Sequence, residues 1–198
     1  MIELVGRTVL VVIDVQKGEV MPGGGIPIMD GGAARHERII ELIDAARRVD
    51  VPPVFIQEVH KRTLIDFGRE LDGVEEVHGL EGDELTELAE GLDPRPDEYL
   101  IRKRRYSAFF ATELELVLKS YGAETLVLVG ALTDVCVHYT FVDAHQHDYR
   151  CRVVVDCVGG SAQYAHDAAL NAMAYLQRDA LVTSDEVLEA FARAGAPA

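Results

Sequence analysis

The chain has 198 residues, a formal net charge of −15, 48% hydrophobic residues and three cysteines. Binding to a phosphate backbone needs basic patches, so this excess of acid argues against a nucleic-acid partner. The length suits one sizeable domain, and we expect a single domain over residues 1–198. No apolar stretch approaches the roughly 20 residues that cross a bilayer, which argues against a membrane partner. The odd cysteine count, without short-spaced pairs, argues against a disulfide framework, and we expect a cytoplasmic protein.

Apolar runs of strand length alternate with amphipathic stretches of helix length along the chain. Strands are predicted at residues 8–15, 53–59, 98–102, 125–131, 152–157 and 180–183, and helices at residues 33–48, 84–90, 111–121, 134–148, 162–177 and 185–194. This alternation predicts a Rossmann-like α/β fold, a three-layer αβα sandwich around a mostly parallel six-stranded sheet. Residues 18–32 and 61–82 form long loops, a common form of active-site cover.

Three residues with reactive or charged side chains lie at or just after the ends of predicted strands. Cys136 lies at the start of a predicted helix, where free N–H groups and the helix dipole favour the reactive thiolate. Asp14 ends the first apolar run, and Lys103 follows the third predicted strand. Carboxyl ends of neighbouring parallel strands meet at one sheet edge, so we expect these three side chains to share a pocket. Lys103 and the helix terminus are expected to lower the pKa of the thiol, while Asp14 accepts its proton.

Three motifs around these residues resemble those of the isochorismatase-like cysteine hydrolases. They read Val-Val-Ile-Asp-Val-Gln at 11–16, Lys-Arg-Arg-Tyr-Ser-Ala-Phe at 103–109 and Gly-Ala-Leu-Thr-Asp-Val-Cys-Val at 130–137. The superfamily also contains nicotinamidases. The chain is identified with the branch of N-carbamoylsarcosine amidases and of ureidoacrylate and biuret hydrolases.

The resemblance implies a role for each matching position. Cys136 would be the nucleophile, Asp14 the general base and later acid, and Lys103 the cation that tunes both. Family members carry a non-proline cis peptide bond, which by position is Ala131–Leu132 here. The backbone N–H groups of Leu132 and Cys136 would form the oxyanion site. Family members commonly form dimers or tetramers, so a homo-oligomer is implied as well.

Other residues have two readings that the sequence leaves open. Tyr106 and Phe109 either line the pocket or pack at the start of the next helix. Thr133 either contacts substrate or caps the helix. Nicotinamidases of the superfamily bind zinc through an Asp-x-His and a second His downstream. Here Glu58 and His60 match the first part, but no His follows within a dozen residues, so we expect no metal and no cofactor. His60 is then a candidate substrate contact.

These observations predict a cysteine-dependent hydrolase. The substrate would be a small amide or ureido compound, cleaved through a thioester with release of ammonia or an amine. Two alternatives remain. One is an isochorismatase-type vinyl ether hydrolase, in which an Asp alone supplies acid catalysis. The other is a non-catalytic binding module on the same fold.

Overall fold

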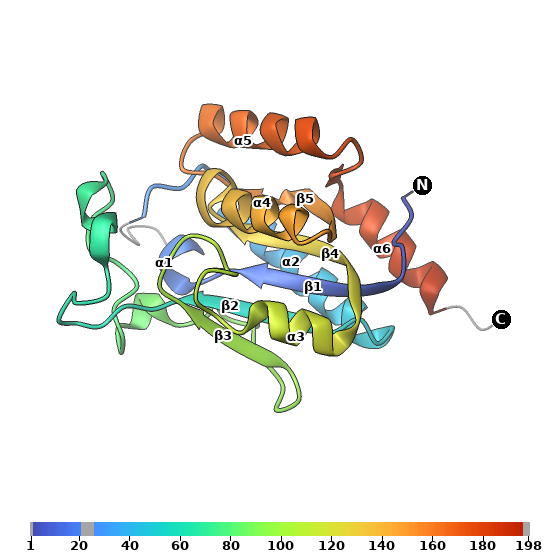
Figure 1. The fold of residues 1–198 in the computed structure, drawn as a ribbon, viewed down its shortest axis with the longest axis horizontal. Coiled ribbons are helices and arrows are strands. Elements are labelled where there is room, and N and C mark those ends of the chain that lie inside the picture. The colour runs from blue at the N-terminus through green and yellow to red at the C-terminus, as the bar shows by residue number, and fades with distance from the viewer. Residues whose placement is uncertain (1, 21–25, 196–198) are drawn as a thin grey trace.

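A computed structural model describes residues 2–20 and 26–195 of the chain. Its centre is a parallel six-stranded sheet with the strand order β3-β2-β1-β4-β5-β6 (Figure 1). The strands are β1 (Arg7–Ile13), β2 (Pro53–Glu58), β3 (Tyr99–Lys103), β4 (Ala123–Ala131), β5 (Arg150–Gly159) and β6 (Leu181–Val182). The helices are α1 (Lys17–Val20), α2 (Gly32–Arg48), α3 (Leu114–Tyr121), α4 (His138–Gln146), α5 (Gln163–Leu176) and α6 (Ser184–Ala194). Two 3-10 turns, η1 (Gly68–Asp72) and η2 (Glu84–Thr86), and one π-helical turn, η3 (Thr133–Val137), complete the list.

The predicted three-layer sandwich is confirmed, because both faces of the sheet are covered by helices. Val9, Val11 and Ile13 of β1 join a buried cluster with residues of α3, α4 and α5. Leu10 and Val12, on the other face of β1, pack with residues of α2 and α6. In Figure 1, α3, α4 and α5 lie in front of the sheet and α2 and α6 behind it. Burying each such side chain contributes about 1.5–3 kcal/mol, which explains why the strands read as continuous apolar runs.

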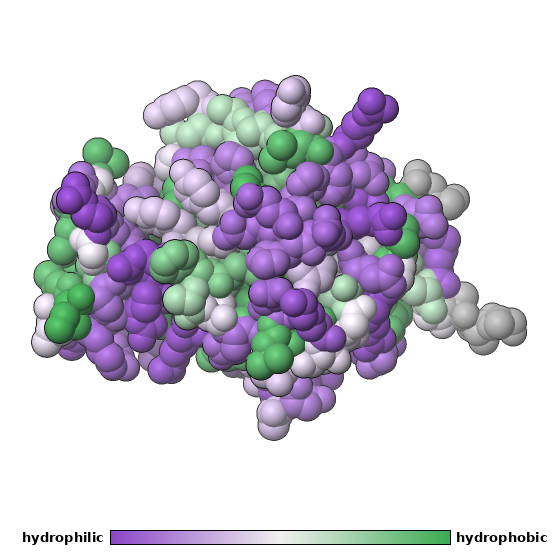
Figure 2. Space-filling model, viewed as in Figure 1, coloured by the Kyte–Doolittle hydropathy of each residue, from purple (hydrophilic) through white to green (hydrophobic). Residues whose placement is uncertain are grey.

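The outer surface contrasts with these clusters. In the view of Figure 2 it is mostly hydrophilic, with separate apolar patches. Within the two described ranges, none of the helices has both the length and the apolar character needed to span a bilayer.

The helix predicted at residues 84–90 is wrong, since only η2 forms there. After one short turn, in which the amide of Glu87 donates to the carbonyl of Glu84, the backbone of this segment bonds to the chain that follows β1. The amide of Lys17 donates to the carbonyl of Glu87 at 2.9 Å, and the amide of Ala89 donates to the carbonyl of Val15 at 3.0 Å. The predicted helix at 134–148 also differs, because it begins as η3 and continues as α4. These two segments carry the chain around the carboxyl end of β1.

The close approach of β1 and β4 depends on Gly130. This residue pairs with Ile13 of β1 and has a φ of +114°. A Cβ atom at this position would lie 1.9 Å from the carbonyl oxygen of Ile13. Gly122, after α3, also has a positive φ (+66°), but no heavy atom within 4 Å would obstruct a Cβ there. It follows the last residue of α3 in the left-handed conformation that is common for a glycine at the end of a helix.

We expect Gly130→Ala to cost at least about 3 kcal/mol of unfolding free energy, since it adds a backbone clash to backbone strain. Gly122→Ala is the matched control and should cost only about 1–2 kcal/mol, because it introduces strain alone. Urea denaturation of both variants measures the difference. Equal losses would mean that the contact between β1 and β4 at Gly130 is not as tight as described.

Candidate active site

Strand register brings the candidate site residues to one edge of the sheet. Ile13 of β1 pairs with Gly130 of β4, so the segments that follow these strands start side by side. Glu58 of β2 pairs with Lys103 of β3 at the same edge. Asp14 directly follows Ile13, and its φ of 51° turns the chain out of the sheet. Short polar residues tolerate this left-handed backbone, which explains how a buried Asp can end β1.

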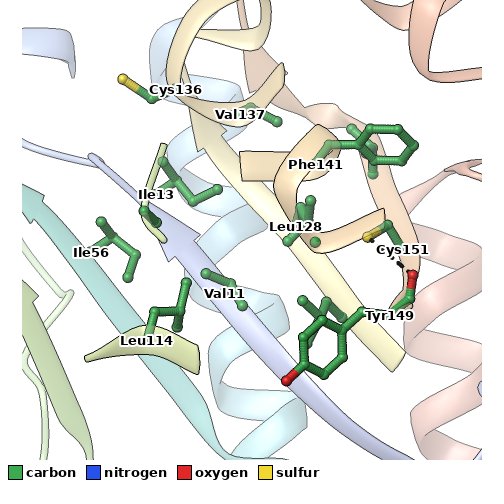
Figure 3. Packing of buried hydrophobic residues seen from close by; sticks show 14 of the residues in the cluster. Val11, Ile13, Ile56, Leu114, Leu128, Cys136, Val137, Phe141, Tyr149 and Cys151 are labelled. Atoms are coloured by element: carbon green, nitrogen blue, oxygen red, sulfur yellow. Dashed lines mark hydrogen bonds between the residues drawn. The ribbon is translucent and has the colours of Figure 1, made fainter. Parts of the chain in front are cut away.

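The three predicted catalytic side chains meet around the ammonium of Lys103. Its Nζ lies 2.8 Å from Oδ2 of Asp14 and 3.3 Å from Sγ of Cys136. It also forms an ion pair and a short hydrogen bond with Oε2 of Glu58, which lies 3.6 Å from the same sulfur. Lys103 is completely buried. Figure 3 shows Cys136 at the margin of the apolar cluster, with its sulfur pointing away from Ile13. The structure therefore brings the predicted trio together and adds Glu58.

Opposite charges stabilise the ionised forms of Lys103 and Glu58 against burial. Burial alone would lower the pKa of Lys103, but Asp14 and Glu58 face the ammonium and hold its pKa well above the ordinary value. Burial would likewise raise the pKa of Glu58, but Lys103, His60 and His78 hold it well below the usual range. The pair is thus charged at neutral pH, as a buried ion pair with good contacts can be.

Asp14 and Cys136 behave in the opposite way, because burial dominates at both. Burial raises the pKa of Asp14 to about 6, even though Lys103 opposes it. Burial also raises the pKa of the Cys136 thiol, and two carboxylates reinforce this effect while Lys103 opposes it. The expectation of a lowered thiol pKa is therefore wrong for this arrangement. An oxygen of Asp14 and one of Glu58 lie within 4.8 Å of the sulfur, so the thiol has a proton acceptor close to it.

A cavity of about 170 Å³ opens above Cys136. Asp14, Leu132 and Cys136 border it at the sheet edge, and Tyr106 forms part of its wall. The remaining lining residues come from the end of β2, from the segments around α1, η1 and η2, and from η3; they are Gln16, Gly18, Glu19, Ile26, Glu58, Glu70, Glu75, Val77, His78, Gly79, Asp83, Leu85, Thr86 and Val135. Residues 26 and 75–86 belong to or adjoin the long loops, which places these loops over the site.

The other predicted contact residues are not among the described residues that line the cavity. His60 is fully buried, with Nε2 3.2 Å from Oε1 of Glu58. Phe109 packs against the core cluster on the α3, α4 and α5 face. Thr133 is also fully buried, and its hydroxyl pairs with Nδ1 of His166 at 2.9 Å. Only Tyr106 of the four predicted contacts borders the cavity in the described part of the chain. The Ala131–Leu132 peptide bond is cis, as the family resemblance implies.

Two polar residues of the motifs connect the site to its surroundings. The amide of Gln16 donates to the carbonyls of Glu58 (3.1 Å) and Thr86 (2.7 Å) and accepts from the backbone N–H of Glu58 (2.9 Å). It thereby joins the ends of β1 and β2 to η2. The hydroxyl of Ser107 donates to Asp143 of α4 at 2.5 Å and fixes the segment after β3. These positions are structural supports of the site.

Glu58 also belongs to a second cluster, which sequence reasoning missed. Glu58, Glu70 and His78 each offer one ligand atom within 4.8 Å of the others, and two carboxylates with an imidazole suit a divalent cation. Burial would lower the pKa of His78, but hydrogen bonds to Glu58 and Glu70 raise it to about 11. His78 is therefore protonated, and its positive charge stabilises the two carboxylates. His78 lies beyond the dozen residues after His60, so the sequence comparison did not include it, and the expected absence of a metal stays a prediction.

Comparison with known proteins identifies the family. Residues 8–186 match the isochorismatase domain, and the chain belongs to this family. Maleamate amidohydrolase of Pseudomonas putida is 40% identical over 91 residues, which cover 46% of this chain and 43% of that protein. Ureidoacrylate amidohydrolase RutB of Azorhizobium caulinodans is 28% identical over 165 residues, 73% of each chain. A cysteine hydrolase from Pseudomonas syringae pv. phaseolicola superposes with a TM-score of 0.84 and 26% identity, over 95% of this chain and 93% of that one.

The raised pKa of Asp14 predicts a pH-dependent stability. The folded protein binds the Asp14 proton more tightly than the unfolded chain, whose pKa is 3.8, so the unfolding free energy should fall as pH rises through this window. Between pH 5 and pH 7 we expect Asp14 to contribute a loss of about 1 kcal/mol, which Asp14→Asn should abolish.

Urea denaturation at several pH values measures this difference. Asp50→Asn is the matched control, because Asp50 shares the left-handed backbone (φ 58°) but its side chain is 91% exposed. Parallel curves for wild type and Asp14→Asn would contradict the raised pKa.

Proposed function

We propose that the protein is a cysteine-dependent hydrolase of a small amide or ureido compound. The observation that carries the proposal is the contact of the Cys136 thiol, the Asp14 carboxylate and the Lys103 ammonium at the floor of a cavity. Family membership and relatives named as amidohydrolases and as a cysteine hydrolase support it. A buried cluster of shifted titratable groups beside a cavity is typical of a catalytic site.

The first half of the reaction forms a thioester. The Cys136 thiol passes its proton to Asp14, whose pKa near 6 suits an acceptor at neutral pH. The sulfur attacks the carbonyl carbon of the substrate. The ammonium of Lys103 stabilises the forming thiolate and stays protonated. In this proposal, the backbone N–H groups of Leu132 and Cys136 stabilise the oxyanion of the tetrahedral intermediate.

The second half returns the enzyme to its starting state. Asp14 gives its proton to the departing nitrogen, and ammonia or an amine leaves. Asp14 then takes a proton from a water molecule, which attacks the thioester carbonyl. The thiolate of Cys136 leaves, regains the proton from Asp14, and the acyl group departs as a carboxylate or carbamate. A single carboxylate can serve both steps because it ends each half reaction in the state that the next one needs.

A divalent cation on Glu58, Glu70 and His78 would supply Lewis acidity beside the sulfur. The steps above need only the side chains of Asp14, Lys103 and Cys136. Assembly into a homo-oligomer remains a prediction from the family resemblance.

We expect Cys136→Ala to reduce ammonia release by about a thousandfold or more, because no other group can form the thioester. The assay measures ammonia from a panel of nicotinamide, biuret, ureidoacrylate, N-carbamoylsarcosine and cationic amides. Cys157→Ala is the control and should retain activity, since this thiol is buried in the cluster on the α2 and α6 face.

Two outcomes would contradict the proposal. Undiminished ammonia release from Cys136→Ala would exclude the thioester route. Cleavage of a vinyl ether by both wild type and Cys136→Ala, without amide hydrolysis by either, would favour the isochorismatase-type reaction.

A further inference from the structure

Acidic side chains dominate the lining of the cavity above Cys136. They are Asp14, Glu19, Glu58, Glu70, Glu75 and Asp83. His78 is the one strongly basic group among the described lining residues, which include no lysine and no arginine. Residues 1, 21–25 and 196–198, outside the description, carry no charged side chain. A substrate that enters this cavity therefore meets carboxylates on several sides.

Several of these carboxylates already have partners. Oε1 of Glu58 lies 3.1 Å, and Oε1 of Glu70 3.5 Å, from Nε2 of the protonated His78. Asp83 pairs with Arg62 at 2.5 Å. Residues of the protein therefore balance the charges of Glu58, Glu70 and Asp83, at least in part. These three groups do not require a ligand of opposite charge.

Glu19 differs from them. The residue is only 7% exposed, and its side chain makes no hydrogen bond or ion pair with any residue in ranges 2–20 and 26–195. Burial, reinforced by Asp14 and Glu58, holds the pKa of Glu19 well above its usual range. The side chain therefore favours its protonated form in this structure, and a cationic group beside it would favour the ionised carboxylate. Because the side chain borders the cavity, a ligand can supply this group.

Tyr106 adds a second feature that suits a positive group. Tyr106 borders the same cavity as Glu70 and Glu75. Burial raises the pKa of its hydroxyl, and these two carboxylates add to the effect. Aromatic faces attract ammonium and guanidinium groups. A carboxylate-bearing substrate would find His78 as the one cationic group on the described walls, and Glu58 and Glu70 already pair with it.

We propose that this enzyme acts on a cationic substrate, a small amide or ureide whose ammonium or guanidinium group is bound by Glu19 while its carbonyl lies at Cys136. The inference rests on the proposed hydrolase function and specifies its substrate class. Glu19 is a specificity residue in this account, since it contacts the charged end of the substrate and not the reacting atoms.

Three amides of similar length test this preference. They are 4-aminobutanamide (cationic), pentanamide (neutral) and succinamate (anionic), and ammonia release gives kcat/KM for each. We expect the cation to be preferred over the neutral amide by about tenfold or more, and the anion to be the poorest substrate. A preference for succinamate, or no dependence on charge, would overturn the inference while leaving the hydrolase function intact.

Glu19→Gln should lower the ratio of kcat/KM between 4-aminobutanamide and pentanamide by about tenfold, because it removes the charge but keeps the shape. Glu37→Gln is the matched control. Glu37 is an exposed residue of α2 outside the cavity, so this variant changes the net charge equally and should leave the ratio unchanged. An unchanged ratio in Glu19→Gln would overturn the role of this residue.

A second experiment is independent of hydrolysis. The rates at which aminoethyl, methyl and sulfonatoethyl methanethiosulfonates modify Cys136, each divided by its rate with a free small thiol, report the charge preference of the cavity. Peptide mass spectrometry identifies the modified cysteine. We expect the cationic reagent to react fastest and Glu19→Gln to reduce its advantage, and the reverse order would overturn the inference. This charge order without hydrolysis of any amide would contradict the hydrolase function and still support a cation-binding cavity.

Discussion

The ammonium of Lys103 lies fully buried between the carboxylates of Asp14 and Glu58 and the sulfur of Cys136. Moving such groups out of water costs several kcal/mol for each ion, and the penalty is offset only where opposite charges make close contact. Lys103 makes this contact with both carboxylates at once. The sheet provides the geometry, since Glu58 and Lys103 are register partners on β2 and β3. The site can therefore hold acidic groups beside a thiol inside the protein.

The balance of charge also bears on the state of the thiol. One ammonium shared among several acidic groups does not suffice to ionise the thiol, and burial raises the pKa values of both Asp14 and Cys136. In the proposed mechanism the proton is transferred between these two neighbours when a carbonyl group arrives, without a persistent thiolate. The acidic groups extend from the sheet edge to Glu19 in the cavity, so the proposed catalysis and the proposed substrate preference both depend on this surplus of acid.

Much of the fold and part of the site could be predicted from local sequence. Continuous apolar runs between amphipathic stretches are typical of strands covered on both faces. Asp14 directly follows β1 and Lys103 ends β3, while Cys136 lies in η3 after β4. Glu58 could have been predicted only from the pairing of β2 with β3, which local periodicity does not specify. The positions of His78 and Glu19 depend on the course of irregular segments around the cavity. The helix predicted at residues 84–90 was wrong because its backbone groups bond to the segment after β1.

A double-mutant cycle between Lys103 and Glu58 tests most directly whether the buried ammonium holds the site together. The unfolding free energies of Lys103→Met, Glu58→Gln, the double variant and wild type are measured by urea denaturation at pH 7. We predict that each single variant loses about 3–5 kcal/mol and that the double variant loses much less than their sum, with a coupling of about 2 kcal/mol or more. Losses that add to within about 0.5 kcal/mol would contradict the account.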